Sequence, residues 1–251
     1  CIRDRIEKKV VPALLAGCCV VLKPSQYTPL TAYILAELID EAGYPAGVFN
    51  LVTGCGPEVG NALALHPDVR MLSFTGSTAA GREVARLALS NIKRIALELG
   101  GKSAAILLPG GDWEFGVKAV LDTVVLNAGQ TCNALTRLLV PAAEQEKANE
   151  IILNTLKQYK KGSNADPESD IGPLSSRRQF DRVKKYIQIG IDEGATLLCG
   201  GLPGQDAEYR IDPTVFVNVK PGMRIEKEEI FGPVLVVVPY ETVDDAVRIA
   251  N

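Results

Sequence analysis

The sequence contains little of what metal sites and disulfide frameworks need. Its 251 residues include one histidine, His66, and six cysteines whose spacing gives no CxxC pair. A metal site is therefore not expected, because zinc is usually held by Cys and His ligands at short, paired spacings. Hydrophobic residues make up 47% of the chain, so it can bury a core without disulfides. Most of the cysteines are expected to be small, buried side chains in a reducing compartment.

An excess of basic charge and long apolar runs are also missing. The formal net charge is −3, whereas a nucleic-acid-binding surface normally carries a basic patch. No run reaches the roughly 18 apolar residues that a membrane-spanning helix needs. The opening residues, CIRDRIEKKV, are charged and do not resemble the apolar core of a secretory signal. These features predict a cytoplasmic protein with neither nucleic-acid nor membrane partners.

Short β-rich runs alternate with helical patterns through the first hundred residues. The strands are predicted at 19–24, 48–54, 71–76 and 95–101, the first of them buried. The helices are predicted at 29–42, 57–65 and 78–89. In the first of these helices, Leu30, Ile34 and Leu38 recur on one face. Alternation of strands and helices is typical of a parallel sheet with right-handed crossovers.

A second alternating unit follows Gly101. Its helices are predicted at about 113–127, 143–160 and 176–193, and apolar runs such as TRLLVP and FGPVLVVVPY read as its strands. The fold class is therefore α/β, in two parts with a boundary between residues 101 and 102.

Two glycine-containing segments follow predicted strands. The segment from Gly54 to Gly60 has the spacing GxGxxxG, not the dinucleotide fingerprint GxGxxG, so a turn-forming role is the simpler interpretation. In FTGST, Gly76 makes a turn and Ser77 or Thr78 can cap the next helix. Backbone N–H groups at such a helix start can bind a phosphate. Capping alone would also explain the serine, and both interpretations stay open.

Two further residues could take part in chemistry. Glu98, in LELGGK, ends an apolar strand, where a carboxylate needs a cleft or a partner. A salt bridge to Lys102 or Arg94 is the alternative. Cys132, in NAGQTC, lies in a polar, glycine-containing segment where a thiol can be exposed and activated. A protease-like Cys–His pair is not expected, since the single histidine is distant in the sequence.

Together, these segments resemble the NAD(P)-dependent aldehyde dehydrogenase superfamily. The matching motifs include LKPSQ, FTGST, LELGGK, GQTC, DIGPLSS and EEIFGP, in that order. The resemblance runs from about residue 10 to the end and covers about the middle half of such an enzyme. It implies an incomplete Rossmann-like, parallel-sheet cofactor-binding domain over residues 1–101. An incomplete second α/β domain over residues 102–251 would carry the catalytic cysteine.

The resemblance also implies roles for individual residues. Cys132 matches the nucleophile that forms a thiohemiacetal and then a thioester, and Glu98 matches the base that activates water to hydrolyse the thioester. The chain would bind NAD or NADP through Lys23, Ser25, Gln26, Gly56, Gly60, Phe74, Gly76, Ser77, Leu99, Glu229 and Phe231.

Six of these residues have a defined place along the cofactor. Lys23 matches the lysine on the adenosine ribose, and Gly76 with Ser77 the contacts to the pyrophosphate. Leu99 matches the backbone partner of the nicotinamide amide. Glu229 matches the carboxylate on the nicotinamide ribose, with Phe231 packed against that end. The parent protein is expected to be a homodimer or homotetramer that takes an aldehyde as its small-molecule substrate.

The sequence departs from the family pattern in three places. It lacks the Trp-Asn-(Phe/Tyr)-Pro-like segment that supplies an oxyanion-binding asparagine shortly before the strand leading to Lys23. It also carries Gln26 where NAD-preferring members usually have Glu, so the cofactor preference stays open. Asn133 and Leu135, after the nucleophile, differ from the commoner pattern and are expected to shape the substrate pocket.

Three functions are compatible with the sequence. The leading one is oxidation of an aldehyde to a carboxylic acid. The second is a CoA-acylating relative, but Glu98 argues against it because acyl transfer to a thiol needs no base for water. The third is a truncated, catalytically inactive module that binds a nucleotide or a protein partner, which the missing asparagine segment favours.

Overall fold

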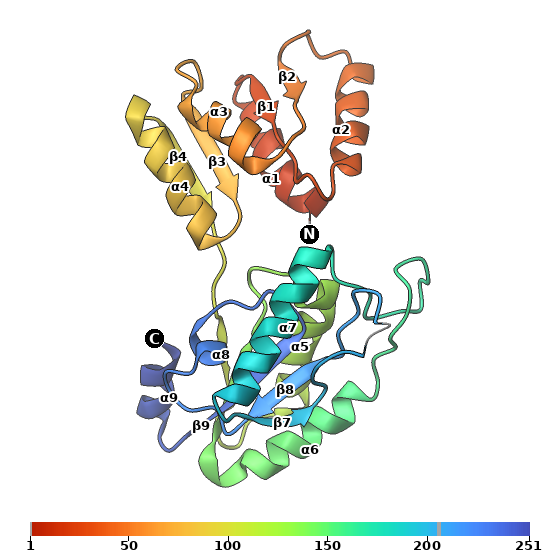
Figure 1. The fold of residues 1–251 in the computed structure, drawn as a ribbon, viewed down its shortest axis with the longest axis vertical. Coiled ribbons are helices and arrows are strands. Elements are labelled where there is room, and N and C mark those ends of the chain that lie inside the picture. The colour runs from red at the N-terminus through yellow and green to blue at the C-terminus, as the bar shows by residue number, and fades with distance from the viewer. Residues whose placement is uncertain (1, 205–206) are drawn as a thin grey trace. The chain divides into compact units, whose positions relative to one another are not determined.

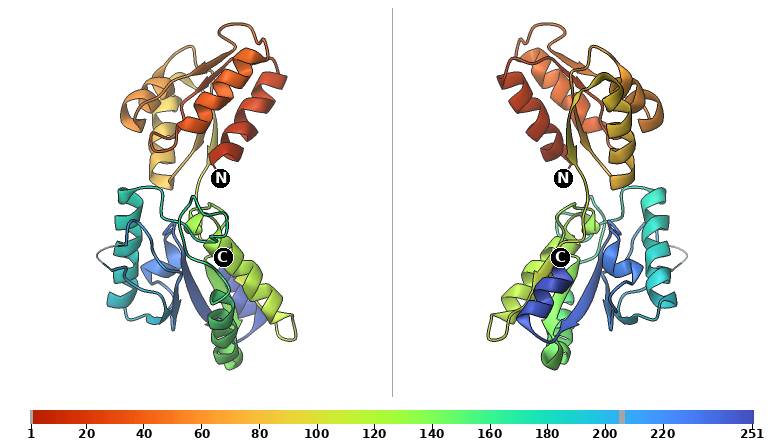
Figure 2. Two further views of the ribbon diagram at one scale, coloured as in Figure 1. Left: turned by 90° about the vertical axis from the view of Figure 1, so that its right-hand side faces the viewer. Right: turned by 90° about the vertical axis from the view of Figure 1, so that its left-hand side faces the viewer.

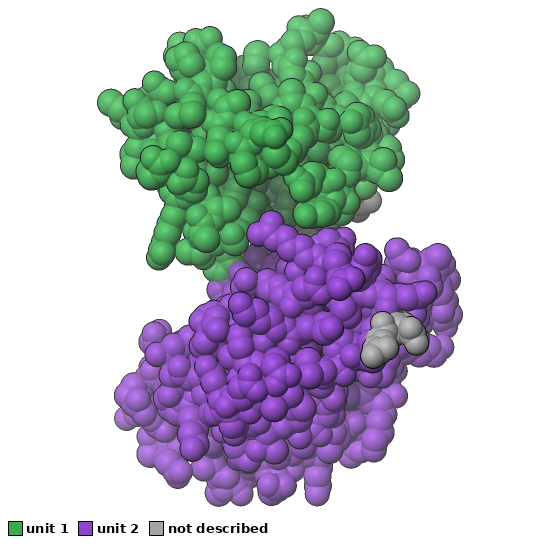
Figure 3. Space-filling model, in the orientation of Figure 1, with its two compact units in different colours: residues 1–100 green, residues 101–251 purple. Residues whose placement is uncertain are grey.

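The computed structural model describes residues 2–204 and 207–251, with the backbone alone for residues 2–4. It divides into two compact units, residues 1–100 and 101–251 (Figures 1 and 3). Each unit has its own hydrophobic clusters and is described separately.

The first unit pairs its strands in parallel. Its elements in order are α1 (Ile2–Leu15), β1 (Val20–Leu22), α2 (Leu30–Glu41), β2 (Phe49–Leu51), the π-helical turn η1 (Gly56–Gly60), α3 (Asn61–Leu65), β3 (Met71–Thr75), α4 (Thr78–Ala88), the 3-10 turn η2 (Leu89–Asn91) and β4 (Arg94–Glu98). Strand β1 pairs with β2, and β3 pairs with β4, both in parallel. The strand–helix alternation expected from the sequence is confirmed here, and α1 is an addition to it.

Side chains alternate between the two faces of β1. Val20 and Leu22 pack against a cluster that Ile6 and Val10 of α1 form with an alanine of α2. Val21 points to the opposite face and is 45% exposed. The expectation of a buried strand is therefore wrong for Val21, because α1 and α2 cover only the face that Val20 and Leu22 share.

Helix α2 has an apolar side that faces solvent. Leu30, Ile34 and Leu38 do share one face, as their spacing predicts, but they are 74%, 56% and 56% exposed. The inward side of the helix is formed by Ala32, which is fully buried, and by Leu35 and Ile39.

The second unit contains a five-stranded sheet. Its elements are β5 (Ala104–Ile106), α5 (Trp113–Val125), η3 (Leu126–Gly129), β6 (Arg137–Pro141), η4 (Ala142–Glu144), α6 (Gln145–Leu156), α7 (Arg177–Asp192), β7 (Thr196–Cys199), β8 (Thr214–Val217), α8 (Arg224–Lys227), β9 (Val234–Tyr240) and α9 (Val243–Ala250). The strand order is β5-β6-β9-β8-β7, and the pairs are parallel except for β7 with β8.

Helices cover both faces of this sheet. Helices α5 and α6 pack on one face and α7 on the other, as the two side views in Figure 2 show. Along β9, Leu235 and Val237 join the cluster under α5, whereas Val234 and Val236 join the cluster under α7. Burial on both faces explains the unbroken apolar run of this strand.

In the part of the chain that the structure describes, no helix combines the length and the apolar character needed to cross a lipid bilayer.

Candidate active site

The carboxyl ends of β3 and β4 bring several predicted site residues together. The register pairs Thr75 with Glu98, and the N–H of Gly76 donates a hydrogen bond to the carbonyl oxygen of Glu98 at 3.1 Å. Ser77 then caps α4, since its Oγ accepts a hydrogen bond from the Ala80 N–H at 3.3 Å. The predicted capping role is confirmed. Ligands of open parallel sheets usually bind at this edge.

Glycines allow close packing around the start of α4. A Cβ atom added to Gly76 would lie 2.5 Å from Cζ of Phe74, and one added to Gly81 would lie 2.6 Å from Cδ2 of Leu99. Phe74, Gly76, Ser77, Glu98 and Leu99 therefore form one group in the first unit. The backbone N–H groups of the first turn of α4, with the positive end of its dipole, make this group suitable for an anion.

Glu98 lies near cations of α1. Its side chain is 60% exposed, and its Oε2 lies 3.8 Å from Nη1 of Arg5. Lys9, one turn further along α1, donates a hydrogen bond to Ser73 Oγ at 2.6 Å. Burial lowers the pKa of Lys9, and the nearby Glu98 carboxylate partly opposes that shift. The ion partner that the structure gives Glu98 is thus Arg5, which the sequence did not suggest.

Lys23 lies at the ends of β1 and β2. Its ammonium donates hydrogen bonds to the carbonyl oxygens of Pro24 at 2.8 Å and Gly54 at 3.3 Å. Burial lowers the pKa of Lys23. Its Cε would lie 3.9 Å from a Cβ on Gly60, so the side chain lies beside η1. The two neighbouring site residues, Ser25 and Gln26, are both exposed.

The glycines between Gly54 and Gly60 shape the backbone. Gly54 has φ 142°, and a Cβ there would lie 2.4 Å from Cγ2 of Val59. Gly56 begins the π-helical turn that leads into α3. These observations fit the turn-forming interpretation of this segment, with Gly60 beside the Lys23 side chain.

In the second unit, the loop before Cys132 has an unusual backbone. Asn127, Ala128 and Gly129 follow one another with φ of 53°, 52° and 71°, all in the left-handed region. The buried Gln130 side chain fixes this turn. Its Nε2 donates to the Asn127 carbonyl at 2.9 Å, and its Oε1 accepts from the Ser175 N–H at 3.0 Å. Cys132 follows this turn and is half-buried.

The other described cysteines differ in exposure. Cys18 and Cys19 are exposed, and Cys55 and Cys199 are half-buried. The expectation that most cysteines are buried is therefore wrong: none of the five described cysteines is buried, and the pair just before β1 is exposed. Burial raises the pKa of the Cys199 thiol. Cys1 lies outside the described residues.

The substrate pocket was expected to be shaped by Asn133 and Leu135, and the structure gives these two residues different surroundings. Asn133 is exposed. Leu135 packs against the cluster beneath α5, and its N–H donates to Thr123 Oγ1 at 3.0 Å. Core packing therefore accounts for Leu135.

Glu229 and Phe231 lie in the segment between α8 and β9. Glu229 is half-buried, and burial raises the pKa of its carboxyl group. A hydrogen bond from the Gly101 backbone and the nearby Arg182 and Lys102 oppose that rise. Phe231 has φ 62°. Glu98 belongs to the first unit, whereas Cys132, Glu229 and Phe231 belong to the second.

A buried charge cluster lies beside Glu229. Arg137, at the start of β6, forms an ion pair with Glu226 at 3.2 Å and donates to the Lys102 carbonyl at 2.8 Å. The Lys102 ammonium is buried and, among the described residues, has no hydrogen-bond partner. Burial, aided by the nearby Arg137, lowers the pKa of Lys102 to about 7, while Glu226 and Glu229 oppose this shift. No local sequence pattern predicts this cluster, because its members come from separate parts of the chain.

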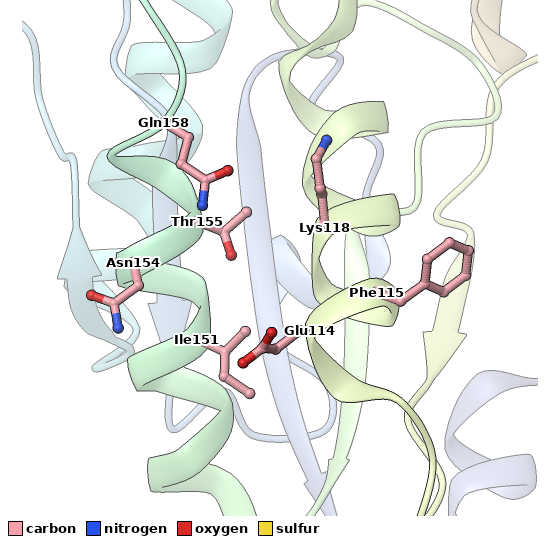
Figure 4. A pocket seen from close by; sticks show the side chains of 7 residues that line it. All are labelled: Glu114, Phe115, Lys118, Ile151, Asn154, Thr155 and Gln158. Atoms are coloured by element: carbon pink, nitrogen blue, oxygen red, sulfur yellow. The ribbon is translucent and has the colours of Figure 1, made fainter.

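A pocket of about 360 Å³ lies between α5 and α6 (Figure 4). Its lining is polar at several positions and contains none of the predicted site residues; it consists of Glu114, Phe115, Lys118, Ile151, Asn154, Thr155 and Gln158. Over residues 2–204 and 207–251, no group of three or more His, Cys, Asp or Glu side chains is arranged to hold a metal ion.

Comparison with known proteins identifies the family. The model of the aldehyde dehydrogenase family matches residues 6–251. The 3-succinoylsemialdehyde-pyridine dehydrogenase of a Pseudomonas species is 47% identical over 251 residues, which cover 99% of this chain and 53% of that protein.

Solved structures agree with this match. A mutant of aldehyde dehydrogenase C from Pseudomonas syringae, complexed with NAD+ and octanal, superposes with a TM-score of 0.96 at 46% identity, over 98% of this chain and 52% of that one. Betaine aldehyde dehydrogenase from Staphylococcus aureus, in complex with NAD+, superposes with a TM-score of 0.93 at 38% identity, over 97% and 49%. The chain spans about half the length of these relatives. On this evidence, the chain belongs to the aldehyde dehydrogenase family.

Proposed function

We propose that the protein containing this chain oxidises an aldehyde to a carboxylic acid with NAD+ or NADP+, using Cys132 as nucleophile and Glu98 as base. The loop of Cys132 carries the proposal. The half-buried Cys132 thiol follows a turn of three residues with left-handed backbone conformation. The Gln130 side chain holds this turn through hydrogen bonds made by both its nitrogen and its oxygen. A nucleophile that must meet a carbonyl carbon in one orientation benefits from such rigid positioning.

The residues of each unit suit one part of the cofactor. In the first unit, the capped start of α4 at Gly76 and Ser77 would hold the pyrophosphate, and Lys23 would contact the adenosine ribose. In the second unit, Glu229 and Phe231 would hold the nicotinamide ribose. Relatives of this chain that bind NAD+ support this assignment. We therefore propose residues 1–101 as part of the cofactor-binding domain and residues 102–251 as part of the catalytic domain.

The proposed reaction has two halves. The Cys132 thiolate adds to the aldehyde carbon, and its backbone N–H can donate a hydrogen bond to the resulting oxyanion. When bound, the cofactor supplies the acceptor for the hydride that leaves this carbon, so that a thioester remains on Cys132. The Glu98 carboxylate, 60% exposed and therefore open to water, then removes a proton from the water molecule that hydrolyses the thioester.

The test is an assay of the full-length protein with a panel of aldehydes that includes octanal, with each cofactor. We expect reduction of the cofactor and formation of the free acid, and loss of both in Cys132→Ala. Cys55→Ala, a matched change at another half-buried thiol, should retain turnover. Activity that survives Cys132→Ala would overturn the proposal.

The same assay separates the alternatives. Formation of an acyl-CoA product when CoA is added would indicate the CoA-acylating reaction. Binding of NAD+ without turnover of any aldehyde would indicate an inactive binding module. We also predict that the parent protein is a homodimer or homotetramer and that it is located in the cytoplasm.

A further inference from the structure

The segment that carries Glu229 and Phe231 has a backbone that needs external support. Phe231 adopts φ 62°, and a bulky residue in the left-handed region costs about 1–2 kcal/mol. Such a conformation persists only where the surroundings fix it. The carbonyl groups of this segment can receive that support as hydrogen bonds from neighbouring side chains.

Helix α7 supplies hydrogen-bond donors to three successive carbonyl groups of the segment. Gln179 Nε2 donates to the carbonyl oxygens of Phe231 at 2.6 Å and Ile230 at 3.2 Å. Arg182 donates from Nη2 to the Glu229 carbonyl at 2.6 Å and from Nε to the Ile230 carbonyl at 3.3 Å. Gln179 and Arg182 are three residues apart on α7 and so lie on one face of the helix.

Arg182 is itself held in position. Its guanidinium group lies over the ring of Tyr186, 4.9 Å from the centroid. Tyr186 is only 6% exposed, and its hydroxyl donates a hydrogen bond to Glu228. Arg224 binds both oxygens of the same carboxylate at 2.8 and 3.0 Å. The Arg182 side chain is therefore oriented by these contacts within the second unit.

The backbone of the segment also packs directly on α7. A Cβ atom on Gly232 would lie 2.4 Å from Cγ2 of Val183, so only glycine fits this contact without movement. On the other side, the Gly101 backbone N–H binds the Glu229 carboxylate. The segment is thus held from α7 and from the chain before β5.

We propose that Gln179 and Arg182 are positioning residues that hold the Glu229–Phe231 backbone so that the Glu229 carboxylate and the Phe231 ring face the nicotinamide ribose. The inference rests on the proposed function, because that function assigns the cofactor to these two side chains. The effect of Gln179 and Arg182 is confined to the nicotinamide end of the cofactor.

The test compares binding of NAD+ with binding of ADP, which probes the adenosine end alone. Calorimetry on the full-length protein would measure the dissociation constants for Gln179→Ala, Arg182→Ala and Glu229→Gln. We expect each α7 variant to raise the dissociation constant of NAD+ about tenfold, the effect of losing one or two hydrogen bonds. ADP binding should change less than about twofold. Arg182→Lys, which retains an N–H donor, should recover part of the NAD+ affinity.

Arg178→Ala is the matched control, since Arg178 is an exposed arginine on the same helix, and it should alter neither constant. If Glu229→Gln weakens NAD+ binding while both α7 variants leave it unchanged, the inference is overturned and the proposed function stands. An equal loss of NAD+ and ADP binding would mark a general structural defect and would also overturn it. If Glu229→Gln has no effect on NAD+ binding, the assignment of this segment to the cofactor fails, and the inference fails with it.

Discussion

Gly129, in the loop before Cys132, and Gly232, in the segment before β9, are in direct backbone contact. A Cβ atom added to Gly129 would lie 2.2 Å from the Gly232 carbonyl oxygen, closer than real Cβ atoms approach any neighbour. The loop of the proposed nucleophile and the segment of Phe231 therefore rest on each other without an intervening side chain. A displacement of one is transmitted to the other.

Gly129→Ala should disturb this contact. We expect it to lower the free energy of unfolding by about 2–4 kcal/mol, because it combines left-handed strain with a backbone clash. Iodoacetamide labelling of Cys132, read by mass spectrometry, should change in rate as the loop moves. Gly110→Ala is the control, because Gly110 has a similar φ of +75° and a Cβ added there would meet no atom within 4 Å. If the two variants lose the same stability, the contact with Gly232 contributes nothing.

Glu98→Gln should affect the second half of the reaction. An amide cannot remove a proton from water, so thioester hydrolysis should slow by about 10²-fold or more. The first hydride transfer does not need this base. A rapid burst of reduced cofactor in stopped-flow measurements should therefore survive while steady-state turnover collapses. Glu37→Gln, at an exposed position of α2, should leave both phases intact, and unchanged turnover in Glu98→Gln would remove Glu98 from the mechanism.

Gln26→Glu should shift the cofactor preference toward NAD+. The neutral Gln26 does not repel a 2′-phosphate, so we expect the dissociation constants of NAD+ and NADP+ to differ by no more than about tenfold, or roughly 1.4 kcal/mol. A carboxylate at this exposed position would accept hydrogen bonds from the ribose and repel the phosphate. Titrations with both cofactors measure the shift, and Gln158→Glu in the second unit is the control. A hundredfold preference for NAD+ that the substitution leaves unchanged would place Gln26 away from the ribose.

Lys102 should make the stability of the second unit depend on pH. Burial lowers its pKa in the folded protein to about 7 from a usual value of 10.5. Between about pH 7 and pH 10.5, Lys102 is protonated in the unfolded chain but not in the folded protein, so the free energy of unfolding should rise with pH. Below about pH 7, Lys102 is protonated in both states and should not contribute to the pH dependence. Urea unfolding followed by the fluorescence of Trp113, the only tryptophan and 4% exposed, reports on this unit.

The contribution of Lys102 is the difference between the wild-type protein and Lys102→Met. We expect this difference to change by on the order of 1–4 kcal/mol between about pH 6 and pH 10. Lys185→Met, at an exposed position of α7, should follow the wild-type curve. If Lys102→Met also follows it, the ammonium is not buried in solution.

The features that the sequence could predict are those encoded by neighbouring residues. The strand–glycine–serine pattern predicts the turn at Gly76 and the cap at Ser77, because a cap forms within one helical turn. The apolar run FGPVLVVVPY predicts a strand, and the structure shows this strand, β9, with both faces buried. Motif order was sufficient to recognise the family, which the comparisons confirm.

Long-range contacts explain what the sequence could not predict. The apolar spacing in α2 does not reveal which side of the helix meets α1, and Leu30 is exposed as a result. Helix α1 contains Pro12, and a proline in the sequence normally predicts that a helix ends or kinks there. The contacts of Gln179 with Phe231 and of Arg5 with Glu98 join residues from distant parts of the chain, so no local pattern predicts them.

The parallel register of β3 and β4 determines where the chain can change in length during evolution. Thr75 stands opposite Glu98 because every position from Arg94 to Glu98 is paired with β3. One residue inserted near Ser90, in η2, would lengthen a connection and leave that pairing intact. The same insertion within β4 would turn the Glu98 side chain to the other face of the strand pair. Natural homologues should therefore vary in length before Arg94 and keep a constant length from Arg94 to Glu98.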